Sequence, residues 1–452
     1  MKKLFGTDGI RSVAGKYPLD QPTVYAIGLA LAHSLAASSP SPRVILGMDT
    51  RESGPAIAAT LTAGLKAGGA SVENAGIITT PAIAFLTREK KFSAGIVISA
   101  SHNPWQDNGI KVFGPDGYKL PDAVELGIED EIFRQLETSH ELPSEFSLSD
   151  APPVNESDRA DYIRFLLASV PGLSLDNRRI VIDCANGAAS SVAPQLFANL
   201  NGHDVIVTHA SPDGRNINEA CGALHPEIVA AEVKKHGAQL GITFDGDADR
   251  ALFADEHGRV VNGDAVLLLA ARDLQARGLL TNNTVVATTM SNMGLEAALK
   301  RSGIKMLRAA VGDKYVLEQM REINAALGGE QSGHIIFSGR STTGDGLLTA
   351  LLLLDIVHRS GKSLAELIAD LKVFPQVIVN VKVREKRPLE DIPPVASAIA
   401  IAEKELADTG RVVIRYSGTE ALARVMIEAE SEPLMRHHAD NIANAIRKEL
   451  GI

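Results

Sequence analysis

Residues 179–250 decide the fold: RIVIDCANGAASSVAPQLFANLNGHDVIVTHASPDGRNINEACGALHPEIVAAEVKKHGAQLGITFDGDADR. Short β-branched runs alternate here with runs of helical pattern. They predict strands at Arg179–Asp183, Asp204–Thr208 and Leu240–Phe244, and helices at Ala188–Leu200 and Pro226–His236. Strands that alternate with helices of about 10–15 residues are typical of βαβ units. The stretch therefore predicts an α/β fold with mostly parallel sheets.

The same alternation continues on both sides of this stretch. Earlier in the chain it predicts a strand at Arg43–Leu46, a helix at Pro55–Gly68 and a strand at Ala94–Ser99. Later it predicts a helix at Asp264–Arg277, a strand at Val285–Thr288, and a helix at Ser291–Arg301 with Ser291 as its N-cap. Three blocks of this kind, architecturally alike, fit before about residue 372.

The chain changes character near Phe374-Pro375. Beyond that point three strands and two helices are predicted, at Gln376–Val383, Pro394–Ala407, Arg411–Arg415, Ala423–Glu428 and Pro433–Leu450. This order indicates a small α+β unit. The predicted domains are therefore residues 1–152, 153–254, 255–372 and 373–452.

Composition and charge exclude several classes of protein. Of the 452 residues, 45% are hydrophobic and 22% charged, which is ordinary for a globular protein and excludes disorder as the main state. A net charge of −10 disfavours a general binder of nucleic-acid phosphates. Eleven acidic residues and one basic residue between Asp122 and Asp158 account for that charge. They indicate an acidic surface helix followed by a domain linker.

Cysteine usage and hydropathy bear on location. Cys184 and Cys221 are too few for a disulfide framework or, by themselves, for a zinc site, and they fit buried structural residues in a reducing compartment. The longest apolar stretch, Leu347–Val357, falls short of the roughly 20 residues that span a bilayer. No signal-peptide pattern follows the first residues. We expect a cytoplasmic protein without membrane attachment.

The first motif whose residues could take part in a reaction is Ile98-Ser99-Ala100-Ser101-His102-Asn103-Pro104. An apolar strand ends here in small hydroxyl residues, and ligands of parallel α/β sheets gather at the carboxyl ends of strands. Ser101 is placed to accept or donate a phosphoryl group, with His102 and Lys111 available to stabilise charge. A Ser/Asn-rich turn that only caps a helix would have the same composition.

The second motif is Asp245-Gly246-Asp247-Ala248-Asp249-Arg250, which follows the apolar strand that ends at Phe244. Three carboxylates at alternating positions are costly unless a cation neutralises them, and they suggest Mg²⁺ or Ca²⁺. An EF-hand is excluded because Arg250 stands where that loop needs glycine and because the flanks have strand patterns. A plain acidic turn remains the alternative.

Two further motifs are weaker on their own. Gly328–His334 precedes an apolar run and offers two side chains able to hold sugar hydroxyls or an amine, but by itself it fits a glycine-rich turn better. Arg415–Glu420, with Arg424 beyond it, combines guanidinium groups with small hydroxyl residues and glycine. Such a loop suits a dianionic phosphate, but it also fits an ordinary connection between two strands.

Together these motifs resemble those of the α-D-phosphohexomutase family, from Phe5 to the end of the chain. The matching segments are FGTDGIR (5–11), DTRESG (49–54), TPAIAFL (80–86), GIVISASHNPWQDNGIKVF (95–113), DGDADR (245–250), SNMGLE (291–296), GEQSGH (329–334), TTGDG (342–346) and SGTE (417–420). Segments 212–218, 221–227 and 291–296 favour the branch that acts on glucosamine phosphates. The family fold implies three similar α/β/α sandwich domains and a smaller α+β domain around a central cleft.

The resemblance also implies roles for individual residues. Ser101 would be the phosphoserine, and one Mg²⁺ per chain would lie between its phosphate and Asp245, Asp247 and Asp249. Glu330, Ser332 and Arg250 would bind the sugar. The non-reacting phosphate would be bound by Arg415, Ser417, Gly418, Thr419 and Arg424. Arg11, His102 and Lys111 would support the transferring group, with Lys111 a candidate general acid/base.

The implied reaction starts with transfer of the phosphoryl group from Ser101 to O1 of glucosamine 6-phosphate. The resulting glucosamine 1,6-bisphosphate reorients and returns its 6-phosphoryl group to Ser101, which leaves glucosamine 1-phosphate. The expected partner is a phosphosugar, and a homodimer is left open. The alternatives are a sister mutase for glucose or mannose phosphates, for which Gln331 is the residue to watch, a metal-dependent sugar phosphatase, and a non-catalytic phosphosugar sensor.

Overall fold

The computed structural model describes residues 3–6, 8–137, 152–417 and 421–452. Contacts divide the chain into two units, one formed by Met1–Met290 with Met306–Ile368 and the other by Ser291–Lys305 with Ala369–Ile452. None of the helices in these described ranges is long and apolar enough to cross a membrane.

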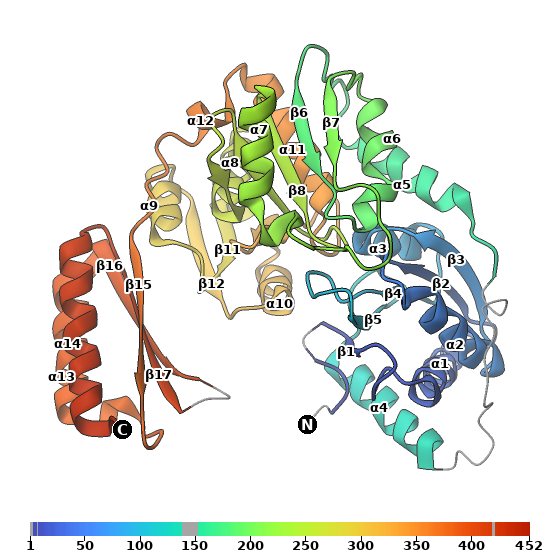
Figure 1. The fold of residues 1–452 in the computed structure, drawn as a ribbon, viewed down its shortest axis with the longest axis horizontal. Helices are drawn as coiled ribbons and strands as arrows, with labels where there is room; N and C mark the ends of the chain where they lie inside the picture. Colours follow the sequence, from blue (N-terminus) through green and yellow to red (C-terminus); the bar gives the residue numbers. More distant parts are fainter. Residues whose placement is uncertain (1–2, 7, 138–151, 418–420) are drawn as a thin grey trace. The chain divides into compact units, whose positions relative to one another are not determined.

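The first sheet of the larger unit has the strand order β1-β5-β4-β2-β3. Its strands are β1 (Ile10–Val13), β2 (Arg43–Met48), β3 (Ser71–Ile77), β4 (Ala94–Ile98) and β5 (Asp107–Phe113). Its helices are α1 (Gln21–Ala36), α2 (Gly54–Ala67), α3 (Thr80–Glu89) and the acidic α4 (Asp122–Glu137). Figure 1 shows α3 on the side of the sheet opposite α1, α2 and α4, so the sheet is covered on both faces.

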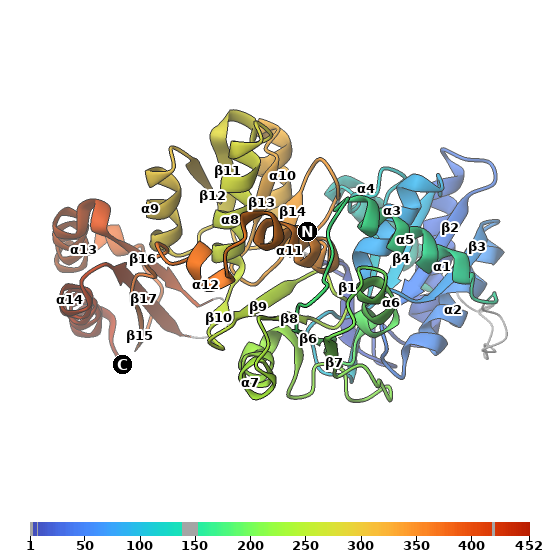
Figure 2. The same ribbon diagram turned by 90° about the horizontal axis from the view of Figure 1, so that it is seen from above.

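The second sheet repeats this arrangement with the order β10-β9-β8-β6-β7. Its strands are β6 (Ile180–Asp183), β7 (Val205–Thr208), β8 (Leu240–Phe244), β9 (Ala251–Asp255) and β10 (Val260–Val261). Its helical segments are α5 (Glu156–Ala168), η2 (Ala188–Ser191), α6 (Ala193–Ala198), η3 (Gly222–Leu224) and α7 (Pro226–His236). In Figure 2, α7 and α11 (Gly346–Ser360) lie on opposite faces of this sheet.

The third sheet has the order β12-β11-β13-β14. Its strands are β11 (Thr284–Thr288), β12 (Lys305–Ala309), β13 (Leu327–Gly329) and β14 (Ile335–Phe337). They are accompanied by α8 (Gly263–Ala276), η4 (Thr281–Asn283), α10 (Asp313–Ile323) and α12 (Leu364–Leu367). The three sheets share one core order, β3-β2-β4-β5, β7-β6-β8-β9 and β12-β11-β13-β14, which confirms the expected likeness of the three blocks.

The sheets are mixed rather than mostly parallel, which corrects the prediction from sequence. β4, β8 and β13 run parallel to one neighbour and antiparallel to the strand that follows each of them. Residues 99–106, 245–250 and 330–334 connect these antiparallel pairs and are too short for a crossover helix. These connections contain the serine, aspartate and Glu330 motifs, so each motif lies where a buried strand turns back.

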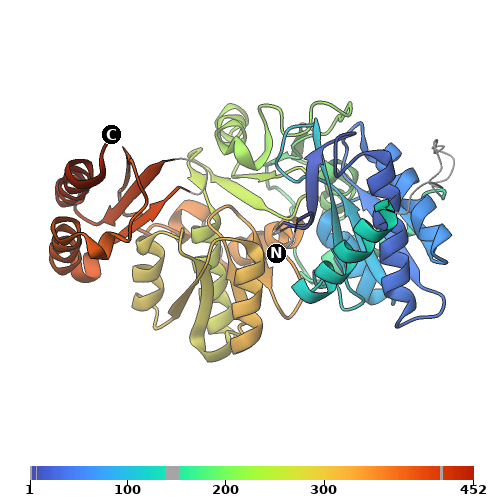
Figure 3. The same ribbon diagram turned by 90° about the horizontal axis from the view of Figure 1, so that it is seen from below.

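The smaller unit has a three-stranded antiparallel sheet of order β15-β17-β16. Its elements are α9 (Met293–Arg301), β15 (Gln376–Lys382), η5 (Leu389–Asp391), α13 (Pro393–Leu406), η6 (Ala407–Thr409), β16 (Gly410–Tyr416), β17 (Leu422–Ala429) and α14 (Glu432–Leu450). Figure 3 shows α13 and α14 side by side against this sheet, with the core between them and the strands. The α+β prediction is confirmed.

Two local predictions are wrong. The predicted helix at Ala188–Leu200 is interrupted at Val192 and forms the short segments η2 and α6. Helix α9 begins at Met293, and its N-cap is Asn292 rather than Ser291. The Asn292 side chain accepts a hydrogen bond from Gly294 N (2.9 Å), as an N-cap residue does, and also exchanges hydrogen bonds with the backbone of Phe374.

Replacing Asn292 tests this corrected cap. Asn292→Ala removes the acceptor for Gly294 N and Phe374 N and the donor to Phe374 O, so we expect a loss of about 2 kcal/mol in the free energy of unfolding. Asn292→Asp keeps the acceptor oxygen and is expected to lose less. Chemical denaturation of the full chain measures both variants, and an unchanged midpoint for Asn292→Ala would contradict the assignment.

Candidate active site

Ser101 stands at the end of β4 and touches the aspartate loop directly. Its side chain is almost fully buried, and its Oγ donates a hydrogen bond to Asp245 Oδ2 at 2.6 Å. Its backbone has φ +52°, a left-handed conformation that costs a serine roughly 1 kcal/mol or more. The surrounding contacts therefore hold the hydroxyl in one place.

Arg51 supplies most of those contacts. Its guanidinium group is buried and donates to the carbonyl oxygens of Ser101 (2.9 Å), Asn103 (2.8 Å), Asp107 (3.0 Å) and Pro104. Its Nε donates to Asp49 Oδ2 at 2.9 Å. Burial raises the pKa of Asp49, and Arg51 opposes that shift. The sequence singled out residues 49–54 only as a segment that matches the family, because nothing local shows that one arginine side chain binds a loop fifty residues away.

The three aspartates form a compact acidic cluster. Asp245, Asp247 and Asp249 are buried, and their ligand atoms all lie within 4.8 Å of one another. Burial raises the pKa of Asp245 well above its usual range, and repulsion from Asp249 and Asp247 adds to the shift. Asp247 Oδ1 and Asp249 Oδ1 are buried, and neither has a hydrogen-bond partner among the described residues. Hard oxygen donors left free at this spacing fit a divalent cation such as Mg²⁺.

The serine and aspartate loops are also in contact through their backbones. A side-chain atom on Gly246 would lie 2.4 Å from Ser101 O, so only glycine allows this approach. Asn218 Nδ2 donates to the same carbonyl oxygen at 2.9 Å, and Asn218 N donates to Ala185 O. The hydroxyl and the carboxylates are therefore fixed relative to one another by main-chain contacts.

Lys111 is the central cation of the site. Its ammonium group is buried and lies 2.8 Å from Asp247 Oδ2, 3.0 Å from Asp8 Oδ2 and 3.8 Å from Asp249 Oδ2. Burial alone would lower the pKa of Lys111, but these carboxylates raise it well above its usual value. Arg11 forms an ion pair with Asp8 beside it. Burial, Arg250 and Arg11 lower the pKa of His102 to about 4, so this ring is neutral at neutral pH.

A chain of charged groups that the sequence did not predict links Lys111 to the third sheet. Lys119 bridges Asp8 and Asp313. Asp313 Oδ2 lies 3.8 Å from His334 Nε2, and His334 Nδ1 lies 3.6 Å from Asp249 Oδ1. Gly344 N donates to Nε2 at 3.0 Å, which leaves the ring proton on Nδ1, facing Asp249. The only signal for His334 was its place in the GEQSGH segment.

The Glu330 loop continues the site from β13. Glu330 Oε1 accepts a hydrogen bond from Gly312 N (3.1 Å), and Oε2 accepts one from Ser332 Oγ (3.4 Å). Arg250 N donates to Asp245 Oδ1 at 3.2 Å. Gln331 turns toward helix α8, where its amide donates to Asp264 Oδ2 at 3.3 Å. Glu330 and Ser332 therefore lie together. Glu330 is also close enough to Arg250 for its negative charge to favour the charged guanidinium group, as Asp245 and Asp249 do more strongly.

The predicted phosphate loop belongs to the smaller unit. Arg415 at the end of β16 is the register partner of Arg424 on β17, so two guanidinium groups lie opposite each other on one face of the sheet. Like charges in this position are unfavourable unless an anion bridges them. Lys386 Nζ donates to Ser417 O at 2.6 Å and adds a third positive charge. Gly418 and Thr419 lie outside the described residues.

The Arg51 contacts give a testable consequence. Arg51→Met keeps roughly the length of the side chain but removes the cation that pairs with the buried Asp49 and takes one hydrogen-bond donor from each of four carbonyl oxygens. We expect a loss of about 3–5 kcal/mol in the free energy of unfolding and faster amide hydrogen exchange at residues 101–107. Arg164→Met is the matched control, because Arg164 is exposed and pairs with Asp161 on its own helix α5, and it should change little. Unchanged exchange in Arg51→Met would contradict this account.

Comparisons with known protein families match most of the chain. Four domains described as phosphoglucomutase/phosphomannomutase match: α/β/α domain I at residues 2–139, domain II at 160–258, domain III at 262–374, and the C-terminal domain at 378–445. The phosphoglucosamine mutase of Koribacter versatilis is 60% identical over 100% of this chain and 98% of its own length. That of Solibacter usitatus is 52% identical over 100% of this chain and 99% of its own length.

Solved structures show the same fold at lower identity. A phosphoglucomutase/phosphomannomutase family protein from Burkholderia thailandensis has a TM-score of 0.79 at 24% identity and covers 100% of both chains. The Aspergillus fumigatus N-acetylphosphoglucosamine mutase, in complex with GlcNAc-6P and magnesium, has a TM-score of 0.67 at 20% identity over 99% of this chain and 96% of that one. The chain therefore belongs to the phosphoglucomutase/phosphomannomutase family, in its phosphoglucosamine mutase branch, and is an isomerase.

Proposed function

We propose that this enzyme interconverts glucosamine 6-phosphate and glucosamine 1-phosphate through phosphorylated Ser101 and glucosamine 1,6-bisphosphate. The observation that carries the proposal is the 2.6 Å contact between Ser101 Oγ and Asp245 Oδ2, at the edge of a buried cluster of three carboxylates. A hydroxyl group in that place can bear a phosphoryl group next to a cation. The names of the full-length relatives support glucosamine as the sugar.

Charge compensation is what the site would contribute to phosphoryl transfer. Asp245, Asp247 and Asp249 would hold one Mg²⁺, which when bound neutralises charge on the phosphoryl group. Lys111 keeps a stable positive charge because the neighbouring carboxylates raise its pKa, so we favour charge stabilisation over its use as a general acid or base. Arg11 and neutral His102 would orient the phosphoryl oxygens.

Substrate positioning would fall to two other groups of residues. Glu330 and Ser332, which already share a hydrogen bond, would hold sugar hydroxyls, with Arg250 beside them. In the smaller unit, the opposed Arg415 and Arg424 would bind the phosphate that is not reacting, together with Ser417, Gly418 and Thr419. Turning the bisphosphate around would then exchange its two phosphates between these positions.

The domain boundaries, the cellular location and the oligomeric state are also proposals. The division into four domains at about residues 152, 254 and 372 is supported by the four family matches. A cytoplasmic location and a homodimer are predictions from sequence.

A mutase assay with three substrates tests the proposed function. Wild-type enzyme is given glucosamine 1-phosphate, glucose 1-phosphate and mannose 1-phosphate, with Mg²⁺ and a trace of sugar bisphosphate, and free phosphate is measured in parallel. We expect the highest kcat/KM for the amino sugar and no phosphate release. Equal or better rates on a neutral sugar would move the chain to a sister branch, and stoichiometric phosphate release would indicate a phosphatase.

The same assay with Ser101→Ala tests the mechanism. The variant should fold, because among the described residues the hydroxyl contacts only Asp245 Oδ2 (2.6 Å) and His102 Nδ1 (3.3 Å), and turnover should be abolished. Ser99→Ala is the matched control: it loses hydrogen bonds to Asp49 and to Ser101 N but keeps the acceptor of the phosphoryl group, so activity should fall only in part. Near-full activity of Ser101→Ala would overturn the mechanism.

A further inference from the structure

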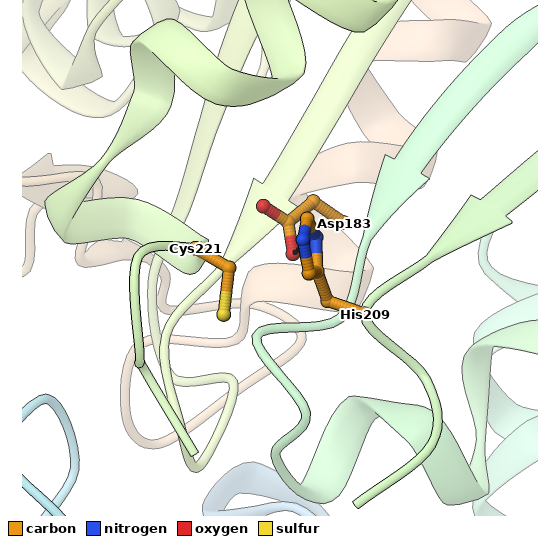
Figure 4. A group of neighbouring side chains, drawn as sticks. All are labelled: Asp183, His209 and Cys221. Carbon is orange, nitrogen blue, oxygen red and sulfur yellow. Dashed lines mark ion pairs between the residues drawn. The ribbon is translucent and has the colours of Figure 1, made fainter. Parts of the chain in front are cut away.

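A second cluster of metal-ligating side chains lies in the same sheet as the aspartate loop but takes no part in the site described above. Asp183 ends β6, His209 follows β7, and Cys221 precedes η3 (Figure 4). One ligand atom from each lies within 4.8 Å of the other two. The cluster stands at the carboxyl ends of two parallel strands, which is where α/β sheets bind ligands.

Asp183 and His209 bring two potential metal-ligand atoms close together. His209 Nδ1 lies 3.1 Å from Asp183 Oδ1. Nδ1 is buried, and no hydrogen bond of good angle joins it to any residue in the described part of the chain. A nitrogen and an oxygen atom at this separation can both reach one cation, whose bonds to them are about 2.0–2.2 Å.

The carboxylate and the thiol are held in place by their surroundings. Asp183 Oδ1 accepts a hydrogen bond from Ala185 N (2.9 Å), and Oδ2 accepts one from Gly222 N (2.8 Å). Backbone donors of this kind orient the carboxylate of a metal site. The Cys221 side chain is fully buried. Glu232 near His209 and Glu219 near Cys221 add negative potential that favours a cation.

We propose that Asp183, His209 and Cys221 bind one divalent cation of the Zn²⁺ class. A carboxylate oxygen, an imidazole nitrogen and a thiolate sulfur are the ligand types that Zn²⁺ takes, whereas Mg²⁺ prefers oxygen alone. Binding converts the Cys221 thiol to a thiolate and releases its proton to solvent. Three protein ligands leave one position of a tetrahedral cation open, which water would occupy.

The bound cation would join two loops that support the active site. The Asp183 carboxylate accepts hydrogen bonds from the backbone N of Ala185, in one loop, and of Gly222, at the end of the other. From these loops Ala188 N donates to Gly246 O (2.8 Å) and Asn218 Nδ2 donates to Ser101 O (2.9 Å). The site is therefore distinct from the aspartate cluster in its ligands but is coupled to it through the main chain. We expect Zn²⁺ to raise the melting temperature of the protein.

Cobalt titration of the full chain tests the proposal, because Co²⁺ replaces Zn²⁺ and a thiolate ligand gives it strong charge-transfer absorption in the near ultraviolet. Excess Mg²⁺ is present to occupy the aspartate cluster. We expect the band to saturate at a single equivalent of Co²⁺ and to disappear when Zn²⁺ is added. Absence of the band at a large excess of Co²⁺ would overturn the proposal.

Variants assign the ligands. Cys221→Ala should lose the band and the stabilisation by Zn²⁺, and Cys184→Ala, which removes the other buried thiol, is the matched control that should keep both. His209→Ala, at a half-exposed position, carries the same test if Cys221→Ala fails to fold. Asp247→Asn should leave the band intact. The proposal would be overturned if Cys184→Ala lost the band and Cys221→Ala kept it. It would also be overturned if Asp247→Asn lost the band and His209→Ala kept it, because the cation would then bind elsewhere.

Discussion

The compensation of buried charge around Ser101 is the constraint on which the rest of the larger unit depends. Asp245, Asp247 and Asp249 are removed from water next to the serine hydroxyl. An isolated carboxylate in such surroundings costs several kcal/mol, so each needs a cation or a hydrogen bond within reach. Lys111 supplies part of that compensation. The two carboxylate oxygens without partners mark the part left for a metal ion.

The repeated topology explains why these groups meet. In each of the three sheets a buried strand turns back into an antiparallel neighbour, and the connecting loop carries a motif. A loop of this kind is held at both ends by strands, which gives its side chains a fixed position. Gly246 brings two of the loops into backbone contact. Lys119 and Asp313 add an ionic link between the first and third sheets.

The sequence predicted the parts of this arrangement that are local. Strand endings before Ser101 and Asp245, and the crowding of carboxylates, are visible in consecutive residues, and the structure brings these residues together. The antiparallel return strands were missed because short buried strands lack a distinct period. Arg51, Lys119 and the cluster of Asp183, His209 and Cys221 were also missed, since their roles depend on contacts between residues far apart in the chain. Ser291 was preferred to Asn292 as a cap because both are good N-cap residues and only the backbone distinguishes them.

The central claim is that a phosphoryl group on Ser101 shares one cation with the three aspartates. Phosphorus NMR of the phosphorylated enzyme, with Mn²⁺ in place of Mg²⁺, tests it most directly. A paramagnetic ion bound beside the phosphoserine should broaden its resonance strongly in the wild type, and the broadening should be lost in Asp247→Asn. A sharp phosphoserine resonance in the wild-type enzyme saturated with Mn²⁺ would contradict the account.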